Sequence, residues 1–545
     1  MQSAISEEEL IPPEAASITQ PAGGAAVART ASVLSLGNIA SRVLGLARDT
    51  IKSHLFGATW RVTAFENAAV VPTQLYELVI GGMISSALVP VFSEYATPER
   101  REELERLAGT LFTLAAITLA GVMLLAEGAA PVIAWLLGSG YDEKTLALAT
   151  SLLRIMLPAV LFLSLSGLLT GLLYALKKFT LPAFTSAVFN ATIVISALTL
   201  GPRLGVDSMA IGILIGGMAQ IALQVPGLRG LRLRPRLDLQ HPALRRIIKL
   251  YLPVAASLII SQVGIYLSYN LASYTGESSI AWMRYATTLI QFPLGLVSAA
   301  ISLAILPTLS RQSQAQSAAD PATANRPFLS TLAHGLKLVL ILMIPATVGL
   351  FVLAHPIVAL VFQHGEFTPQ DTVATALLLR LYLFGLTFAA IDQPLIFAFY
   401  ARKDTLTPAL VGLGCIGIYL AAALAPTLFR PLQVSDLALA NSIQWISHAL
   451  IMLWLLRRRL GGLGGYGVRS LIAKAAASAV VMGAVAALVA WVLTPATRFG
   501  NTAGHIVIVG GASLAAVIVY GALMVALKAQ ELDIVKQLMG SKKLA

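Results

Sequence analysis

Apolar segments of about 20 residues, the length that a transmembrane helix requires, recur along the whole chain. We place them at 30–52, 64–92, 107–136, 146–174, 181–201, 208–228, 247–272, 280–308, 329–354, 372–400, 408–429, 435–456, 470–494 and 504–527. The composition agrees, because 57% of residues are hydrophobic and only 12% are charged, against roughly 25% charged residues in soluble domains. We predict an all-α polytopic membrane protein with about fourteen transmembrane helices.

The positions of Lys and Arg predict the orientation of these helices. With the N-terminus inside, the inner loops hold most loop cations, including the clusters at 229–236 and 457–459, as cytoplasmic loops usually do. Both termini are therefore predicted to be cytoplasmic. The same clustering accounts for the net charge of +12 through membrane topology, so we expect no nucleic-acid partner.

Two sequence matches indicate an internal duplication. The segment "ALVPVFS" at 87–93 resembles "AILPTLS" at 304–310, and "YALKKFTLPA" at 174–183 resembles "YARKDTLTPA" at 400–409. An even number of helices per unit gives both copies the same orientation, which predicts parallel repeats about an axis along the membrane normal. Transporters built in this way place their substrate between the two halves.

The duplication divides the chain into five parts. Residues 1–28 are acidic, contain prolines and lack the positive start of a signal peptide, so we predict a disordered cytoplasmic tail. The predicted parts after it are an N-terminal six-helix lobe at 29–230, a C-terminal six-helix lobe at 243–460, two further helices at 468–530 that could leave a groove for a lipid tail, and a cytoplasmic tail at 531–545.

The first apolar segment carries charges that lipid would exclude. In "SRVLGLARDTIKSHLFG", 41–57, Arg42 lies roughly 18 Å into the helix, too deep to reach the surface easily, so it is expected to face a cavity or a partner. Arg42, Gly45 and Asp49 share one helical stripe, from which Arg48 points about 100° away. Gly45 is a candidate hinge, whereas Arg48 and Asp49 fit either an outer mouth or an exposed pair near the membrane surface.

Other charges lie within predicted spans, and some of them are expected to form structural ion pairs. They are Glu66, Glu77, Arg154, Arg284, Lys337, Arg380 and Asp392. Arg42, Arg48 and Arg284 come from the first and eighth helices, in different lobes, and Arg binds phosphate oxygens through paired donors. These arginines predict a lipid-linked substrate with an anionic, phosphate-bearing head group.

Several motifs carry a family resemblance. They are "SRVLGLARD" (41–49) with "LFGA" (55–58), "ALVPVFSEY" (87–95), "LLRIMLPAV" (152–160), "LPAF" (181–184), "WMRYA" with "QFPLGLVSAAISLAILPTLS" (282–310), "FQHGEFT" (362–368) and "FYARKDTLTPA" (399–409). In order and spacing they resemble the MurJ (MviN) family of lipid II flippases, in the multidrug/oligosaccharidyl-lipid/polysaccharide exporter superfamily. The resemblance covers about residues 29–530.

The resemblance implies a fourteen-helix, two-lobed, V-shaped transporter in the bacterial cytoplasmic membrane. Such a protein moves the undecaprenyl-pyrophosphate-linked peptidoglycan precursor from the inner to the outer leaflet by alternating access, as cell wall biogenesis requires. Membrane potential or an ion would drive it, with no cofactor. The resemblance also implies that Arg42 and Arg48 are cavity arginines with Asp49 as the adjacent acid, and that the last two helices hold the lipid tail.

The chain departs from the family pattern at several polar positions. Thr63 replaces an Asp, the run at 72–76 reads Pro-Thr-Gln-Leu-Tyr, and Gly81-Gly82 replace Glu-Gly. In the eighth helix, residues 286–293 read Ala-Thr-Thr-Leu-Ile-Gln-Phe-Pro, which puts Gln291 at a position that is usually Glu. We hypothesise that Arg284, one turn before Thr288, replaces a lost arginine, and that Glu66 or Glu77 supplies a missing acid.

These departures leave alternatives to a lipid II flippase. A flippase for another polyprenyl-linked glycan, a cation-coupled drug exporter and a non-transporting cell-wall scaffold remain possible, in that order of preference. We expect no enzyme and no metal site, because no catalytic or metal-ligand motif occurs. The coupling ion stays open, since the candidates in the seventh and twelfth helices are the neutral Gln262, Asn270 and Asn441. The head group and the oligomeric state also stay open.

Overall fold

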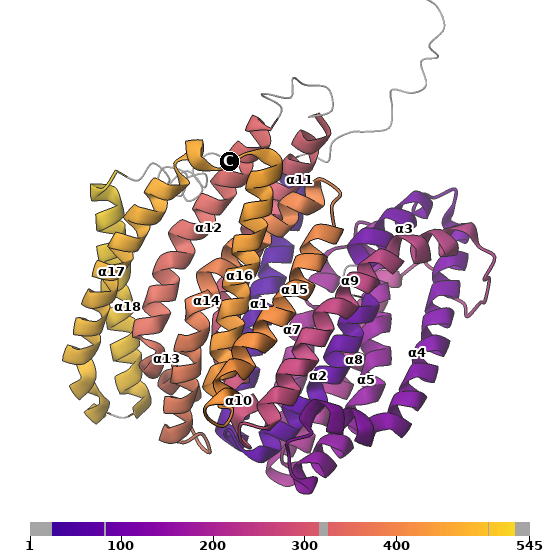
Figure 1. The fold of residues 1–545 in the computed structure, drawn as a ribbon. Coiled ribbons are helices and arrows are strands. Elements are labelled where there is room, and N and C mark those ends of the chain that lie inside the picture. The colour runs from indigo at the N-terminus through magenta and orange to yellow at the C-terminus, as the bar shows by residue number, and fades with distance from the viewer. Residues whose placement is uncertain (1–23, 81–82, 316–324, 500, 529–545) are drawn as a thin grey trace, which may run out of the picture.

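The computed structural model describes residues 24–80, 83–315, 325–499 and 501–528, and these contain helices and no β-strand. Figure 1 shows the fold. The elements of the first half are α1 (Gly24–Phe56), α2 (Trp60–Ile80), the π-helix η1 (Ile84–Leu88), α3 (Val89–Tyr95), α4 (Arg101–Gly138), α5 (Glu143–Ala175), α6 (Thr180–Ala183), α7 (Thr185–Leu204), α8 (Asp207–Gln224) and the 3₁₀ turn η2 (Val225–Leu228).

The second half repeats this pattern of long helices. Its elements are α9 (Pro242–Ser273), α10 (Ser279–Pro293), the π-helix η3 (Leu294–Ser298), α11 (Ala299–Ala315), α12 (Arg326–Val352), α13 (Ala354–Phe362), α14 (Pro369–Ala401), α15 (Leu406–Leu424), η5 (Ala425–Leu428), α16 (Val434–Leu460) and η6 (Gly464–Tyr466). The remaining elements are α17 (Val468–Leu493), η7 (Thr494–Phe499) and α18 (Asn501–Ala526).

All fourteen predicted apolar segments overlap helices, but not all of these helices meet a membrane-span criterion. In the described part of the chain, 11 helices are long and apolar enough to cross a membrane. The helices α1, α2 and α9 are not among these 11. The polytopic all-α class is confirmed, whereas the count of fourteen spans stays a prediction.

The described residues include only a small part of the two predicted tails. The helix α1 begins at Gly24, within the predicted tail at 1–28, whose first 23 residues lie outside the described residues. The predicted tail at 531–545 and the Gly81-Gly82 pair also lie outside them. The predicted lobe boundaries remain predictions, and α9 packs against α2 and α4 of the first half as well as α15 of the second.

The duplicated loops have the same backbone geometry. Lys177, after α5, and Lys403, after α14, both take a left-handed conformation, with φ of 60° and 61°. In each loop the Lys amide donates to the carbonyl of the Tyr three residues earlier, over 2.9 Å from Lys177 to Tyr174 and 2.9 Å from Lys403 to Tyr400. Non-glycine residues rarely adopt this conformation, so the match supports the predicted duplication.

The two halves diverge toward the upper end in Figure 1 and meet toward the lower end. Near the α1–α2 turn, the Glu366 amide donates to the His54 carbonyl over 3.0 Å, and the Tyr285 hydroxyl donates to the Gly57 carbonyl over 2.8 Å. A second tie links the turn between α4 and α5 to α9, where the Gly140 amide donates to the Ser273 hydroxyl over 2.8 Å. These bonds join the halves at the ends of their helices.

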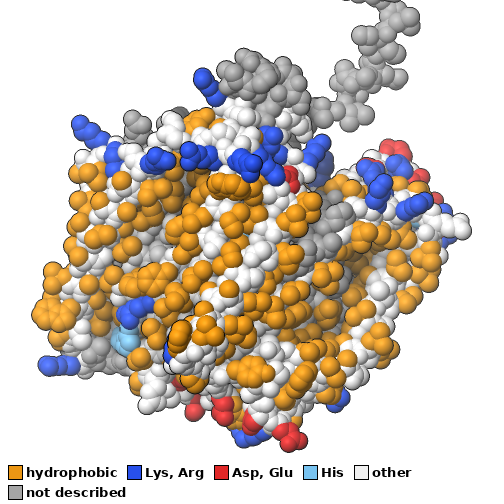
Figure 2. All heavy atoms as spheres, viewed as in Figure 1, with side chains coloured by type: hydrophobic (Ala, Val, Ile, Leu, Met, Phe, Trp, Pro, Cys, Tyr) orange, Lys and Arg blue, Asp and Glu red, His pale blue; other side chains and the backbone are white. Residues whose placement is uncertain are grey.

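The outer surface suits a lipid environment. Figure 2 shows hydrophobic side chains over the flanks of the helices, with Lys and Arg gathered along the upper rim. The exposed apolar residues include Leu124, Leu125, Trp491 and Val517. Exposed apolar area on this scale marks a membrane-facing surface rather than a water-facing one.

Gly365 and Gly205 offer a matched test of the contact at the lower end. Both have φ of +58°, but a Cβ at Gly365 would collide with the His54 carbonyl, whereas a Cβ at Gly205 would have nothing within 4 Å. Alanine is strained at a positive φ in either position, and only Gly365→Ala adds the collision. We expect Gly365→Ala to lower the thermal unfolding temperature in detergent more than Gly205→Ala does. Equal effects would contradict the close contact.

Candidate functional site

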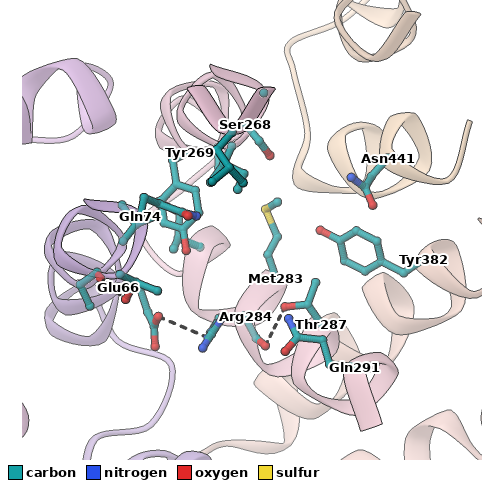
Figure 3. A pocket seen from close by; sticks show the side chains of 18 of the residues that line it. Glu66, Gln74, Ser268, Tyr269, Met283, Arg284, Thr287, Gln291, Tyr382 and Asn441 are labelled. Atoms are coloured by element: carbon teal, nitrogen blue, oxygen red, sulfur yellow. Dashed lines mark hydrogen bonds and ion pairs between the residues drawn. The ribbon is translucent and has the colours of Figure 1, made fainter. Parts of the chain in front are cut away.

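A cavity of about 710 Å³ lies between the two halves of the chain. Its walls come from α1, α2, α5, α7 and α8 of the first half and from α9, α10, α14, α15 and α16 of the second. Figure 3 shows side chains of both halves around it, with Met283 and Tyr382 near its middle. Cavities at such an interface are common ligand sites.

Lys52 is the most deeply buried cation of the cavity wall. Its side chain is 2% exposed and forms an ion pair with Glu66 of α2, while its Nζ also lies 3.2 Å from Asp49 Oδ1, one turn earlier on α1. A buried ammonium requires compensating charges and hydrogen bonds. Lys52 has both, which fixes α1 against α2.

Arg284 extends this network across the interface. It comes from α10 of the second half, and its Nε lies 3.6 Å from Glu66 Oε2 of the first half. Figure 3 shows this contact as a dashed line beside the cavity. The arginine faces the cavity and not lipid, as the hypothesis for Arg284 requires.

Asp49 lies behind the cavity wall and joins the same network. Its side chain is 1% exposed and lies 2.9 Å from Arg48 Nη2. It also accepts a hydrogen bond of 2.8 Å from the Thr288 hydroxyl of α10. Asp49 therefore anchors α1 to the second half, and it is a structural partner of the cations rather than a lining residue.

Arg48 lines the cavity and is held in place by α7. Its Nη1 donates to Asn190 Oδ1 over 3.1 Å, and Asn190 Nδ2 donates back to the Ser41 carbonyl over 3.3 Å. A Cβ at Gly45 would lie 3.7 Å from Asn190 Nδ2, so this glycine faces the same contact. The helix α1 runs unbroken through Gly45, and its role as a hinge stays a prediction.

Arg42 contacts a partner helix, one of its two expected surroundings, and does not line the cavity as the family resemblance implies. Its Nη1 donates to the Gln291 carbonyl over 3.0 Å, and a Cβ at Gly295 would collide with its guanidinium. These partners lie where α10 passes into the π-helix η3, and Arg42 is absent from the residues that line the cavity. In this conformation it binds α1 to the other half, while the Gln291 side chain lines the cavity.

The other predicted charges separate into cavity and surface residues. Glu66 lines the cavity, whereas Glu77 is exposed and does not, so the geometry supports Glu66 as the cavity acid. Arg154 is 52% exposed and lies 3.8 Å from Glu127. Arg380 donates to the Phe351 carbonyl over 3.2 Å. Neither arginine lines the cavity.

The charged lining has an excess of cations. Arg48, Lys52 and Arg284 line the cavity against one carboxylate, Glu66, and Asp49 stands behind them. Lys52 was not among the site residues predicted from sequence, although its spacing of three residues from Asp49 signals an intrahelical pair. Such a surface attracts an anionic group, which Arg can bind through two parallel hydrogen bonds.

Two repeated helical halves around a charged cavity define a membrane transporter. A family model described as "Lipid II flippase MurJ" matches residues 52–530, and the chain belongs to this MurJ family. The "Lipid II flippase MurJ" of Burkholderia cenocepacia is 30% identical over 430 residues, covering 77% of this chain and 81% of that protein. The "Probable lipid II flippase MurJ" of Vibrio cholerae is 34% identical over 395 residues, covering 70% and 74%.

Solved structures match the fold. One entitled "Lipid II flippase MurJ, inward closed conformation" superposes with a TM-score of 0.74 at 24% identity, over 90% of this chain and 97% of that one. An inward-facing multidrug resistance MATE family transporter of the MOP superfamily gives 0.65 at 14% identity, over 78% and 96%. Both likenesses show the same architecture.

Replacing Glu66 tests the buried network. Glu66→Gln leaves Lys52 with less compensating charge. Removing one partner of a buried pair lowers the free energy of unfolding by about 3–5 kcal/mol. Glu127→Gln is the matched control, because its pair with Arg154 is exposed and is worth about 0–1 kcal/mol. We expect Glu66→Gln to lower the thermal unfolding temperature in detergent far more than the control. Comparable melting temperatures would show that the Lys52 pair contributes little.

Proposed function

We propose that this chain is a lipid II flippase that moves its substrate from the inner to the outer leaflet by alternating access. The observation that carries the proposal is the excess of cations in the cavity between the halves. Arg48, Lys52 and Arg284 line it against a single carboxylate, which suits a pyrophosphate. The family's relatives are named for the same substrate.

The geometry supports a mechanism of ion-pair exchange. Arg284 lies 3.6 Å from Glu66, a loose contact that leaves its donors available to another anion. A pyrophosphate that binds Arg284 and Arg48 competes with Glu66 and Asp49 for these cations. Because Arg284 belongs to the second half and Glu66 to the first, this exchange weakens a tie between the halves and couples binding to their movement.

The orientation follows from charge. We infer that the basic rim in Figure 2 faces the cytoplasm, because cytoplasmic loops are rich in Lys and Arg. In this proposed orientation both termini are cytoplasmic and the joined lower ends face outside. The cavity is then accessible from the inner leaflet, where the substrate is made. We place the polyprenyl tail along α17 and α18, whose apolar faces are exposed. In this proposal, the membrane potential or an ion drives transport.

A flippase for another polyprenyl-linked glycan is the second candidate. Thr63 is buried without a hydrogen-bond partner for its hydroxyl, and Gln291 lines the cavity. Both residues are neutral where the family pattern carries acids. The Gln291 substitution changes the lining of the cavity itself, whereas Thr63 lies buried behind it, and the cations Arg48, Lys52 and Arg284 are retained.

Rescue of a depleted host tests the proposed function. In bacteria depleted of their own flippase, we expect this chain to restore outer-leaflet lipid II. Arg284→Ala removes charge-assisted hydrogen bonds and should reduce that lipid about tenfold, and Arg42→Ala should also reduce it by loosening α1 from α10. Arg154→Ala is the control, because Arg154 is exposed outside the cavity.

Two outcomes would overturn parts of the proposal. Failure of the unmodified chain, at normal membrane levels, would favour another glycan lipid as the substrate. Full rescue by Arg284→Ala at equal expression would contradict the assignment of this arginine to the head group. Membrane levels of all variants are measured by immunoblotting.

A further inference from the structure

A histidine–aspartate pair in the second half adjoins the same cavity and takes no part in the cation network. His448 of α16 lines the cavity, and its Nδ1 lies 2.8 Å from each oxygen of Asp392, on α14. The two side chains are 13% and 16% exposed. We call these residues the Asp392–His448 pair.

The surroundings of the imidazole offer acceptors. The Nδ1–H group donates to the Asp392 carboxylate, whose two oxygens both lie 2.8 Å from Nδ1. A carboxylate only accepts hydrogen bonds. Its negative charge, at this distance, favours an imidazolium over a neutral ring.

Other titratable groups near the pair are neutral or are engaged elsewhere. Tyr400 of α14 and Cys415 of α15 lie within electrostatic reach of Asp392. From α9, Tyr269 faces Glu66, and from α10, Arg284 contacts the same carboxylate. His448 is therefore the group of this set whose charge changes near neutral pH.

Protonation of the pair changes the charge of the cavity wall. With a neutral imidazole, Asp392 leaves one negative charge beside the cavity, and with an imidazolium the pair is neutral overall. An anionic head group is repelled less in the second state. By thermodynamic linkage, a ligand that prefers the protonated state also promotes proton uptake.

We propose that the Asp392–His448 pair is a proton-binding site that couples proton uptake to binding of the pyrophosphate head group. This proposal rests on the proposed function, since the head group occupies the cavity that His448 lines. The site requires no metal and no residue of the cation network. Through this site, the second half takes up a proton on substrate binding independently of the cation network.

Calorimetry of the purified full chain in lipid nanodiscs tests this coupling, with undecaprenyl pyrophosphate as the probe. Titrations in buffers of different ionisation enthalpy count the protons taken up on binding. We expect the unmodified chain to take up more protons on binding than His448→Gln does. Lowering the pH from 8.5 to 5.5 should tighten ligand binding by the unmodified chain about fivefold more than it tightens binding by the variant. His334→Gln is the control, because His334 is exposed on α12 outside the cavity.

The outcomes separate the two proposals. Binding with identical proton uptake in the unmodified chain and His448→Gln would overturn the proton site and leave the proposed function intact. Absence of binding in every variant would count against the proposed function. In that case, NMR of ring-labelled histidine still decides the proton site, because a His448 signal that does not shift between pH 5.5 and 8.5 would overturn it.

Discussion

The buried ion pair between Lys52 and Glu66 is the constraint on which the centre of this protein depends. Burying an ammonium costs several kcal/mol unless its partners compensate for the lost hydration. Glu66 and Asp49 provide that compensation, and Glu66 in turn contacts Arg284 from the opposite half. One buried cation thereby sets the relative positions of α1, α2 and α10.

The network contains one more cation than acids, and we link this excess positive charge to binding of the transported anion. Arg48, Lys52 and Arg284 face two acids, Asp49 and Glu66, so an anion is needed to complete their coordination. The Arg284–Glu66 ion pair, which crosses between the halves, is also the longest of these ion pairs at 3.6 Å, whereas the Thr288–Asp49 hydrogen bond across the same boundary is 2.8 Å. A head group that occupies the cavity therefore acts first on the ion pair between Arg284 and Glu66, one of the contacts that join the halves.

The sequence was informative where a pattern depends on local chemistry. The length of the apolar segments predicted the helices, and the two matched loop sequences predicted the duplication. The backbone geometry that Lys177 and Lys403 share supports that duplication. The helical stripe of Arg42 and Asp49 correctly placed both on one face, since both contact α10.

Sequence could not determine which neighbour each face meets. Arg42 reaches a backbone carbonyl at the π-helix junction instead of the cavity, and Glu77 turns away while Glu66 faces inward. Lys52 was missed because a cation near a helix end resembles a loop residue. Asn190 and the Asp392–His448 pair depend on contacts between distant helices, which spacing along one helix does not encode.

The account rests on the head group binding beside Arg284, and site-specific photocrosslinking tests this most directly. A photoreactive amino acid at Met283, which lines the cavity, should crosslink to lipid II in membranes, whereas one at Trp135, exposed on α4, should not. Crosslinking at Met283 should weaken when inorganic pyrophosphate competes. Lipid II crosslinks of equal yield at both positions, or none at Met283, would contradict the account.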